Sequence, residues 1–315
     1  MERMKKILLG AGIVVVLLLA VSAVQQNSSL QEMEPMKTPE LKDPSRVGDY
    51  GVYALELPKT LDFAGESVPL HHPDIKERAD REFLVNTYWQ SNGIMLVKKS
   101  KKYFPIIEAI LAEEGIPDDF KYLAVIESGL DNVKSPAGAS GFWQIMSATG
   151  KELDLEVNSN VDERYHLEKA TRAACKYLKD SKERMGTWTL AAAAYNAGNA
   201  GINRELERQQ VTSYYDLLLG QETGRYVFRI LALKEILKSP ESFGFNVEPE
   251  QYYYQVPTKK ILVDYEIDDL AAFAKANSIN YKILKIHNPW LRENKLNNKS
   301  GKLYEIEIPE NGYYD

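Results

Sequence analysis

The sequence predicts a mainly α-helical protein that ends in a small β-α-α-β module. Apolar residues recur at helical spacing from about residue 76 to residue 240, and no clear strand pattern interrupts them. After residue 250, residues that favour strands become frequent. The stretch 303–308 alternates apolar and polar residues, which is typical of a half-buried strand.

Composition indicates an ordinary globular protein. The 315 residues are 44% apolar and 27% charged, enough for one large domain or two of usual size. The net charge of -6 argues against a nucleic-acid partner, because phosphate binding requires clustered Lys and Arg. The single cysteine, Cys175, excludes an intramolecular disulfide, and its helical, apolar neighbours predict a buried side chain.

The N-terminus has the layout of an export signal. Basic residues precede the apolar run 7–24, and Val21-Ser22-Ala23 is a small-residue pattern that a signal peptidase could cleave. The run is also close to the length that spans a bilayer, about 18 residues. We therefore predict a signal peptide or membrane anchor at 1–24, with the rest of the chain outside the cytoplasm. Pro-rich, polar residues 25–75 predict an extended tether.

Turn and capping residues mark the boundaries of the predicted helices. Apolar spacing indicates a helix at 101–114, which ends at Gly115. Pro117 followed by two aspartates begins the next helix, which ends near Ser128-Gly129. The same reasoning predicts three further helices, at 166–184, 187–197 and 222–238.

The C-terminal residues predict the small module. Stretches 252–256 and 259–265 are rich in strand formers, and Asp268-Asp269 can cap a helix that begins at Leu270. A second short helix fits 281–287, and the strand at 303–308 completes the β-α-α-β order.

Glu127 has the features of a catalytic acid. It shares one helix face with Phe120 and Leu123, so its carboxyl points toward the apolar side. It also lies at the negative end of the helix, and burial and dipole together should raise its pKa. An acid with a raised pKa can protonate a leaving oxygen, as cleavage of a glycosidic bond requires. On this helix alone, the favoured interpretation is a solvated Glu at the end of an amphipathic helix.

Two further segments suit a sugar-binding groove. In 138–146, glycines allow close backbone approach, and Trp143-Gln144 follow at an expected helix start. The amide of Gln144 offers a donor and an acceptor for hydroxyl and acetamide groups. In 193–198, an Ala-rich helix ends in Tyr195-Asn196. The alternatives are a turn with a core Trp for the first segment and plain helix packing with a Gly198 cap for the second.

The order of these motifs, followed by Glu222-Thr-Gly-Arg-Tyr-Val, resembles the lytic transglycosylases of glycoside hydrolase family 23, which are related to goose-type lysozyme. The form of the motifs is similar to the membrane-bound murein transglycosylase branch. The likeness covers roughly residues 100–240. It implies a lysozyme-like helical catalytic domain, which we place at 76–248.

The resemblance also implies roles for individual residues. Glu127 takes the place of the catalytic acid and base, and Ser128 takes the neighbouring position that helps to hold it. Glu222 matches the acid at the start of the last motif. We expect this residue to have a structural role rather than a catalytic one. The positions that match the lining of the sugar groove are Gln144, Tyr195 and Asn196. Tyr226 matches an active-site tyrosine that orients the acid.

The implied reaction is a cleavage without water. Glu127 would protonate the oxygen between N-acetylmuramic acid and N-acetylglucosamine, and the C6 hydroxyl would then close to a 1,6-anhydro end. The alternatives are a lysozyme-like hydrolase and a non-catalytic wall-binding scaffold. For the hydrolase, the acids that could position a water are Asp131, Asp154 and Asp162.

The C-terminal module, 252–310, resembles a divergent LysM domain. The usual Gly-Asp-Thr-Leu turn is replaced by Ile267-Asp268-Asp269-Leu270, so sugar binding and docking on the catalytic domain are both open. No cofactor or metal is expected, because His166 and His287 stand alone and His71-His72 lie in the tether. The expected partner is the glycan strand of peptidoglycan, and the expected location is the periplasm or cell envelope, with any membrane association through the N-terminus.

Overall fold

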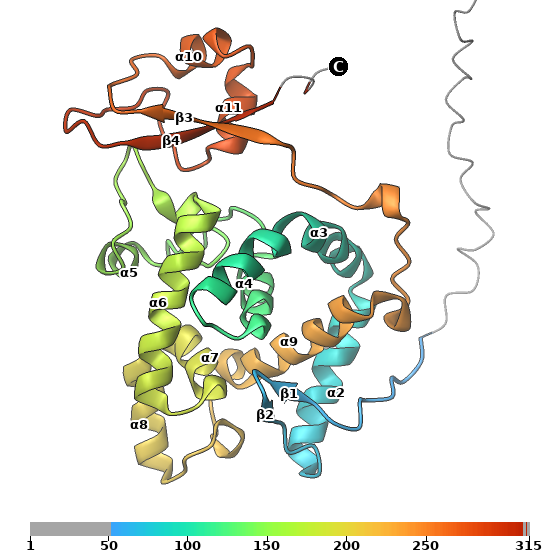
Figure 1. The fold of residues 1–315 in the computed structure, drawn as a ribbon. Coiled ribbons are helices and arrows are strands. Elements are labelled where there is room, and N and C mark those ends of the chain that lie inside the picture. The colour runs from blue at the N-terminus through green and yellow to red at the C-terminus, as the bar shows by residue number, and fades with distance from the viewer. Residues whose placement is uncertain (1–51, 311–312, 314–315) are drawn as a thin grey trace, which may run out of the picture. The chain divides into compact units, whose positions relative to one another are not determined.

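The computed structural model describes residues 52–310 and Tyr313. The predicted signal peptide or anchor at 1–24, and the first part of the predicted tether, lie outside the described residues. Residues 53–310 and Tyr313 belong to one compact unit. As predicted, this unit is mainly helical and ends in a small β-α-α-β module (Figure 1).

The helical domain begins with a short hairpin whose strands have two residues each, β1 (Asp62–Phe63) and β2 (Glu66–Ser67). Helices then follow one another around a shared apolar core (Figure 1). Their bounds are α2 (Pro73–Tyr88), α3 (Gln90–Glu113), α4 (Lys121–Ser128), α5 (Ser147–Glu152), α6 (Leu167–Met185), α7 (Trp188–Ala197), α8 (Asn199–Gln209) and α9 (Gln221–Lys238).

Helix α4 lies in the middle of this domain. The two aspartates after Pro117 form a short 3-10 turn (Asp118–Phe120), and α4 follows directly. It ends as predicted, at a glycine in the left-handed region, Gly129, with φ of 64°. The residues of α4 from Lys121 to Ile126 are all buried, because the helix packs against α3 and α9.

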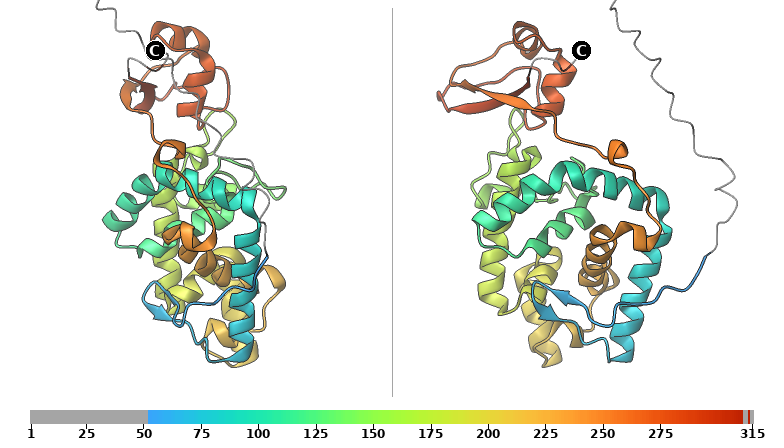
Figure 2. Two further views of the ribbon diagram at one scale, coloured as in Figure 1. Left: turned by 90° about the vertical axis from the view of Figure 1, so that its right-hand side faces the viewer. Right: turned by 45° about the vertical axis from the view of Figure 1, so that its right-hand side comes forward.

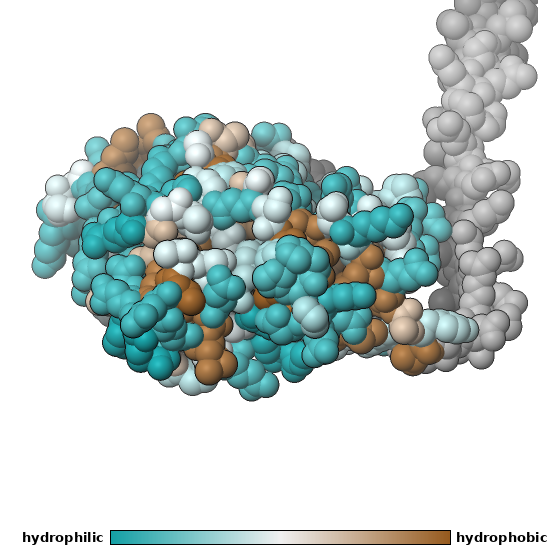
Figure 3. Space-filling model, turned by 90° about the horizontal axis from the view of Figure 1, so that it is seen from below, coloured by the Kyte–Doolittle hydropathy of each residue, from teal (hydrophilic) through white to brown (hydrophobic). Residues whose placement is uncertain are grey.

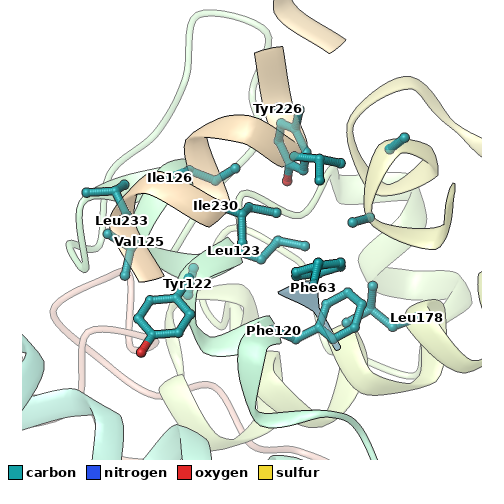
Figure 4. Packing of buried hydrophobic residues seen from close by; sticks show 14 of the residues in the cluster. Phe63, Phe120, Tyr122, Leu123, Val125, Ile126, Leu178, Tyr226, Ile230 and Leu233 are labelled. Carbon is teal, nitrogen blue, oxygen red and sulfur yellow. The ribbon is translucent and has the colours of Figure 1, made fainter. Parts of the chain in front are cut away.

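Aromatic and aliphatic side chains from distant segments meet beneath α4. Phe63 of β1 is fully buried and packs edge-on against Phe120, with ring centroids 5.1 Å apart. Figure 4 shows Tyr226 and Ile230 of α9 beside Leu123 of α4 in the same cluster. This packing joins the start of the described chain to the two helices that carry the candidate site.

The hairpin corrects the predicted tether. Residues 25–75 were expected to be extended, but Leu61 and Phe63 are buried, and α2 already begins at Pro73. Ala64 and Gly65, with φ of 53° and 79°, form the tight turn between β1 and β2. Because prolines surround this short hairpin, the sequence indicated an extended segment instead. The part of the tether prediction from Leu61 onward is therefore wrong.

The other helix predictions differ in detail. Helices α6, α7 and α9 agree with the predicted ranges within two residues. Helix α3 starts at Gln90 rather than at 101 and continues through Pro105, which is exposed. No range was predicted for α2, α5 or α8; α5 spans only six residues, and α8 buries only Ile202 fully.

The C-terminal module has the predicted order. Its strands β3 (Thr258–Val263) and β4 (Tyr304–Pro309) pair antiparallel, and α10 (Leu270–Ala276) and α11 (Tyr281–His287) lie between them in sequence. The Asp269 carboxylate accepts from the first-turn amides of α10, so the predicted cap is confirmed. The predicted strand at 252–256 is wrong: Tyr253 N donates instead to Lys98 O of α3.

The module lies against the loops between α5 and α6 in all three ribbon views (Figures 1 and 2). On the face drawn in Figure 3, hydrophobic side chains lie in small groups between hydrophilic ones. Among the helices of the described residues, none combines the length and the apolar character that crossing a bilayer requires.

Candidate active site

Glu127 lies in the last turn of α4 and is partly buried. Burial raises the pKa of its carboxyl to about 7, and the nearby charge of Glu222 adds to this rise. The Tyr226 hydroxyl and the Arg229 guanidinium act in the opposite direction, because both favour the ionised form. The carboxyl is therefore poised between its two protonation states near neutral pH, as an acid that also acts as a base requires.

Helix α9 supplies the groups that face Glu127. The hydroxyl of Tyr226 donates a hydrogen bond to Glu127 Oε1. Tyr226 is 2% exposed, and burial holds its pKa well above the usual value, so the phenol keeps its proton. One turn further along α9, Arg229 Nη2 donates to Ile126 O at 3.3 Å, which satisfies a carbonyl at the end of α4.

Tyr195, near the end of α7, lies on another side of the site. Burial raises the pKa of Tyr195, and the charge of Glu127 raises it further, which places the two side chains within electrostatic reach. Its hydroxyl donates to Trp143 O at 2.7 Å. This bond ties the end of α7 to the segment that carries Gln144.

Trp143 and Gln144 lie in a turn, so the predicted helix start at these residues is wrong: α5 begins only at Ser147. Trp143 is fully buried and donates from Nε1 to Thr171 Oγ1 at 2.9 Å. It is a core residue, as one of the two interpretations of this segment proposed.

Gln144 adopts a left-handed backbone conformation with φ of 46°. Its Nε2 donates to Gly141 O at 2.8 Å and to Val133 O at 3.1 Å. Both amide hydrogens are thus engaged by the loop, and the side-chain oxygen is the group left to bind a ligand. Gln144 and Tyr195 line one pocket together with Tyr177 and Met146.

Ser128 and Asn196 are bonded to other neighbours. The Ser128 hydroxyl donates to Ala124 O at 3.1 Å, one turn back along α4. Asn196 accepts from Thr223 Oγ1 at 2.8 Å and donates to Glu222 Oε1 at 3.4 Å, so it links α7 to α9. The structure therefore brings Glu127, Tyr226 and Tyr195 together, whereas Ser128 and Asn196 support the elements around them.

The three acids considered for a hydrolase are each paired with a cation. Asp131 Oδ2 lies 2.5 Å from Lys99 Nζ, and Asp154 Oδ2 lies 2.8 Å from Lys176 Nζ. Asp162 is buried in a two-bond pair with Arg164. The carboxylate that acts electrostatically on Glu127 is instead Glu222.

Sequence reasoning missed Arg229 and Arg164. Arg229 lies three residues after Tyr226, a spacing that puts both on one face of a helix and could have drawn attention to it. Arg164 gave no such signal, because its partners Gly138 and Ile145 are distant in sequence. Within residues 52–310, no three His, Cys, Asp or Glu side chains gather as a metal site would require.

Two family models match the chain. Residues 104–217 match the transglycosylase SLT domain, and residues 259–312 match the soluble lytic transglycosylase C-terminal LysM-like domain. The chain carries an SLT transglycosylase domain. Both matches confirm the resemblance that the motifs predicted, for the helical domain and for the module.

Curated relatives of this SLT domain protein include membrane-bound lytic murein transglycosylase D of Escherichia coli K12, which is 27% identical over 194 residues. The match covers 59% of this chain and 42% of the relative, so the chain spans less than half of that protein's length. The protein of the same name from Escherichia coli O6:H1 matches with the same identity and coverage.

Two solved structures are also similar. A lytic transglycosylase Slt from Pseudomonas aeruginosa is 19% identical with a TM-score of 0.38, over 48% of this chain and 26% of that one. The 70 kDa soluble lytic transglycosylase from Escherichia coli is 19% identical with a TM-score of 0.39, over 56% of this chain and 33% of that one.

Proposed function

We propose that this protein is a peptidoglycan lytic transglycosylase that cleaves the β-1,4 bond between N-acetylmuramic acid and N-acetylglucosamine. The product end is a 1,6-anhydro-N-acetylmuramic acid. The observation that carries the proposal is Glu127, a partly buried carboxyl whose pKa is raised to about 7 and which accepts a bond from Tyr226. The SLT domain match supports the same reaction class.

In the first step, neutral Glu127 donates its proton to the bridging glycosidic oxygen. The bond from this oxygen to C1 of the muramic sugar breaks, and the N-acetylglucosamine side leaves as an alcohol. The acetamido oxygen of the muramic sugar stabilises the positive charge that develops at C1. Burial keeps a large share of Glu127 protonated near pH 7, which this step requires.

In the second step, the carboxylate of Glu127 removes the proton from the C6 hydroxyl of the same sugar. That oxygen bonds to C1 and closes the anhydro ring, and Glu127 regains its proton. The hydroxyl of Tyr226 keeps one carboxylate oxygen oriented and stabilises the negative charge between the two steps. No second carboxylate is needed, in contrast to the pair used by most glycosidases.

The remaining residues would hold the glycan. The side-chain oxygen of Gln144 can accept from a sugar hydroxyl or an acetamide N–H, since both amide hydrogens are bonded to the loop. Tyr195 supports this loop through Trp143 O and lines the same pocket as Gln144. We assign Ser128 and Asn196 to supporting roles beside the groove, on the bonds that they make.

The N-terminal pattern and the named membrane-bound relative support export to the cell envelope, where the glycan strand would be the partner. The proposed domain organisation keeps the predicted catalytic domain at 76–248 and the LysM-like module at 252–310. We extend the proposed catalytic domain to residue 61, because Leu61 and Phe63 are buried in its core.

Product analysis tests this function. Purified peptidoglycan is digested with wild-type protein, with Glu127→Gln and with Glu183→Gln, a matched change at an exposed position of α6. We expect anhydro-muropeptides from the wild type and from Glu183→Gln, and no products from folded Glu127→Gln. Reducing-end products, one water heavier, would establish the hydrolase instead, and absence of any product from the wild type would support a binding scaffold.

A further inference from the structure

Residues 156–165, which we call the docking segment, connect α5 to α6 and contact two separate parts of the molecule. On one side lies the C-terminal module. On the other side lies the loop 132–146, which we call the site loop and which carries Trp143 and Gln144. One short segment is thus bonded both to the module and to the candidate groove.

Asn160 is the centre of the contact with the module. Its Nδ2 donates to Lys295 O at 2.8 Å, its Oδ1 accepts from Asn297 N at 2.9 Å, and its backbone O accepts from Arg292 N at 2.8 Å. Asn160 is 6% exposed, so these polar groups would be left unpaired in a buried place if the module moved away.

Backbone pairing and apolar packing extend this contact. Asp162 N donates to Trp290 O at 2.9 Å, beside a β-bridge between Val161 and Leu291. Val161 and Tyr165 belong to the buried apolar cluster of the module rather than to that of the helical domain. The module therefore completes its own core with two side chains of the docking segment.

Arg164 makes the contact with the site loop. Its guanidinium is fixed by Asp162, with Nε–Oδ1 and Nη2–Oδ2 distances of 2.9 and 2.7 Å. From this position Nη1 donates to Gly138 O and to Ile145 O, each at 3.0 Å. One buried guanidinium thus holds both ends of the turn that contains Gln144.

The two backbones also touch directly. A Cβ atom added to Gly141 would lie 1.9 Å from Arg164 O, so only glycine fits there, and its φ of 80° requires glycine as well. Asn132 Nδ2 donates to Tyr165 O at 3.1 Å. The conformation of the site loop therefore depends on where the docking segment lies.

We propose that the C-terminal module is a brace for the substrate groove: by fixing the docking segment, it holds the site loop, with Asn160 and Arg164 as positioning residues. The link runs from the module through Asn160 and the Asp162–Arg164 pair to the carbonyls on either side of Gln144. The kinetic part of the test rests on the proposed function, whereas the structural part needs no substrate.

The structural test is hydrogen exchange of the full chain. In Asn160→Ala we expect the site-loop amides of Ser140, Gly141 and Ile145, which are bonded within the loop, to exchange about tenfold faster or more. The amides of α9 should keep their wild-type rates. The control is Asn277→Ala, which removes one hydrogen bond inside the module, to Phe273 O, and should leave the site loop unchanged.

The kinetic test uses the same variants on peptidoglycan. For Asn160→Ala we expect kcat/KM to fall about tenfold to a hundredfold, chiefly through a higher KM, since the loop that binds the glycan is loosened. The pH profile should stay the same, because the surroundings of Glu127 on α4 and α9 are not changed. A variant that merely unfolded would lose active molecules without a change in KM.

Arg164→Lys tests the link from the other side and serves if Asn160→Ala fails to fold. Lysine keeps the charge beside Asp162 but cannot reach it and both loop carbonyls at once, so the same site-loop amides should exchange faster. Unchanged exchange in the folded variants would overturn the proposal and leave the module as an independent appendage. Faster exchange with an inactive wild type would instead overturn the proposed function alone.

Discussion

Glu127, the proposed catalytic group, is also a point where the fold loses stability. Its ionised form is disfavoured inside the protein, because burial raises the pKa from 4.5 to about 7. Between these two values the folded state binds more protons than the unfolded state, so stability falls as the pH rises through this window. Since each pKa unit corresponds to about 1.4 kcal/mol, the loss amounts to about 3 kcal/mol above pH 7.

Glu127→Gln should therefore stabilise the protein at high pH. The neutral amide has no charged form to bury, so we expect a gain of about 1–3 kcal/mol in the free energy of unfolding at pH 8. No comparable gain is expected at pH 5, where the wild-type carboxyl is protonated. Urea unfolding at both pH values measures this, and an equal effect at the two values would contradict the raised pKa.

Tyr226→Phe should change the pH dependence of activity. The hydroxyl favours the ionised carboxylate, so its loss raises the pKa of Glu127 further and moves the alkaline limb of kcat/KM to higher pH. The loss of orientation should also lower kcat about tenfold or more. Tyr122→Phe is the matched control, because Figure 4 places the Tyr122 hydroxyl on the opposite side of the cluster from Tyr226.

Glu222→Gln should move the same limb in the opposite direction. The negative charge of Glu222 raises the pKa of Glu127, so its removal lowers that pKa and shifts the limb to lower pH. Because Glu222 is exposed, we expect the shift to be small and to disappear at high salt. Complete loss of cleavage in this variant would instead indicate that Glu222 positions a water in a hydrolytic reaction.

The sequence predicted the chemistry of Glu127 better than its surroundings. Its helix face and position at the helix end predicted a raised pKa, and in the structure burial is the main cause that raises the pKa of Glu127 to about 7. Tyr226 lies 99 residues away and could be connected to Glu127 only through a resemblance to a family. Arg229 and Arg164 donate hydrogen bonds to backbone carbonyls. The sequence pattern does not indicate which carbonyl a side chain will bind.

At the scale of elements, capped and strongly periodic helices were predictable and irregular segments were not. The ends of α4 and α7 follow from Gly129 and Gly198, because a glycine with positive φ ends a helix at low cost. The helix start predicted at Trp143-Gln144 is absent, and the left-handed backbone of Gln144 could not be foreseen because it is unusual for a residue with a side chain. The shape of the site loop is imposed by tertiary contacts with Arg164.

The β1–β2 hairpin, which the sequence did not predict, carries Glu66, and Glu66 caps the N-terminus of α7. The Glu66 carboxylate accepts from Trp188 N at 2.6 Å and from Thr189 N at 2.8 Å, the first free amides of that helix. A carboxylate there also interacts favourably with the positive end of the helix. Part of the segment expected to be a tether thus supports the helix that carries Tyr195.

Glu66→Ala should therefore destabilise the whole domain by about 1–3 kcal/mol, because two helix amides lose their acceptor. Glu66→Gln should cost less, since its single carbonyl oxygen still accepts. The measurement is the midpoint of urea unfolding, with Glu183→Ala at an exposed helix position as the control. Equal stability of Glu66→Ala and wild type would show that water replaces the carboxylate.

At the scale of the whole molecule, the helical domain and the module share a buried cluster. Val161 and Tyr165 come from the helical domain, yet they pack with Leu291 and Trp290 of the module. The polar contacts of Asn160 and the pairing of Lys302 with Glu156 at 2.6 Å surround this cluster. Separation of the two parts would expose apolar surface and leave buried polar groups unpaired, so they should unfold together.

We accordingly expect a single cooperative transition in scanning calorimetry of the protein. Val161→Ala should lower the stability of that one transition by about 1–3 kcal/mol, because the side chain is 1% exposed and its loss leaves a cavity. Val85→Ala, at a position 41% exposed on α2, should have little effect. Two separate transitions in the wild type, with Val161→Ala moving only one, would show that the module folds independently and would remove the physical basis for its action on the groove.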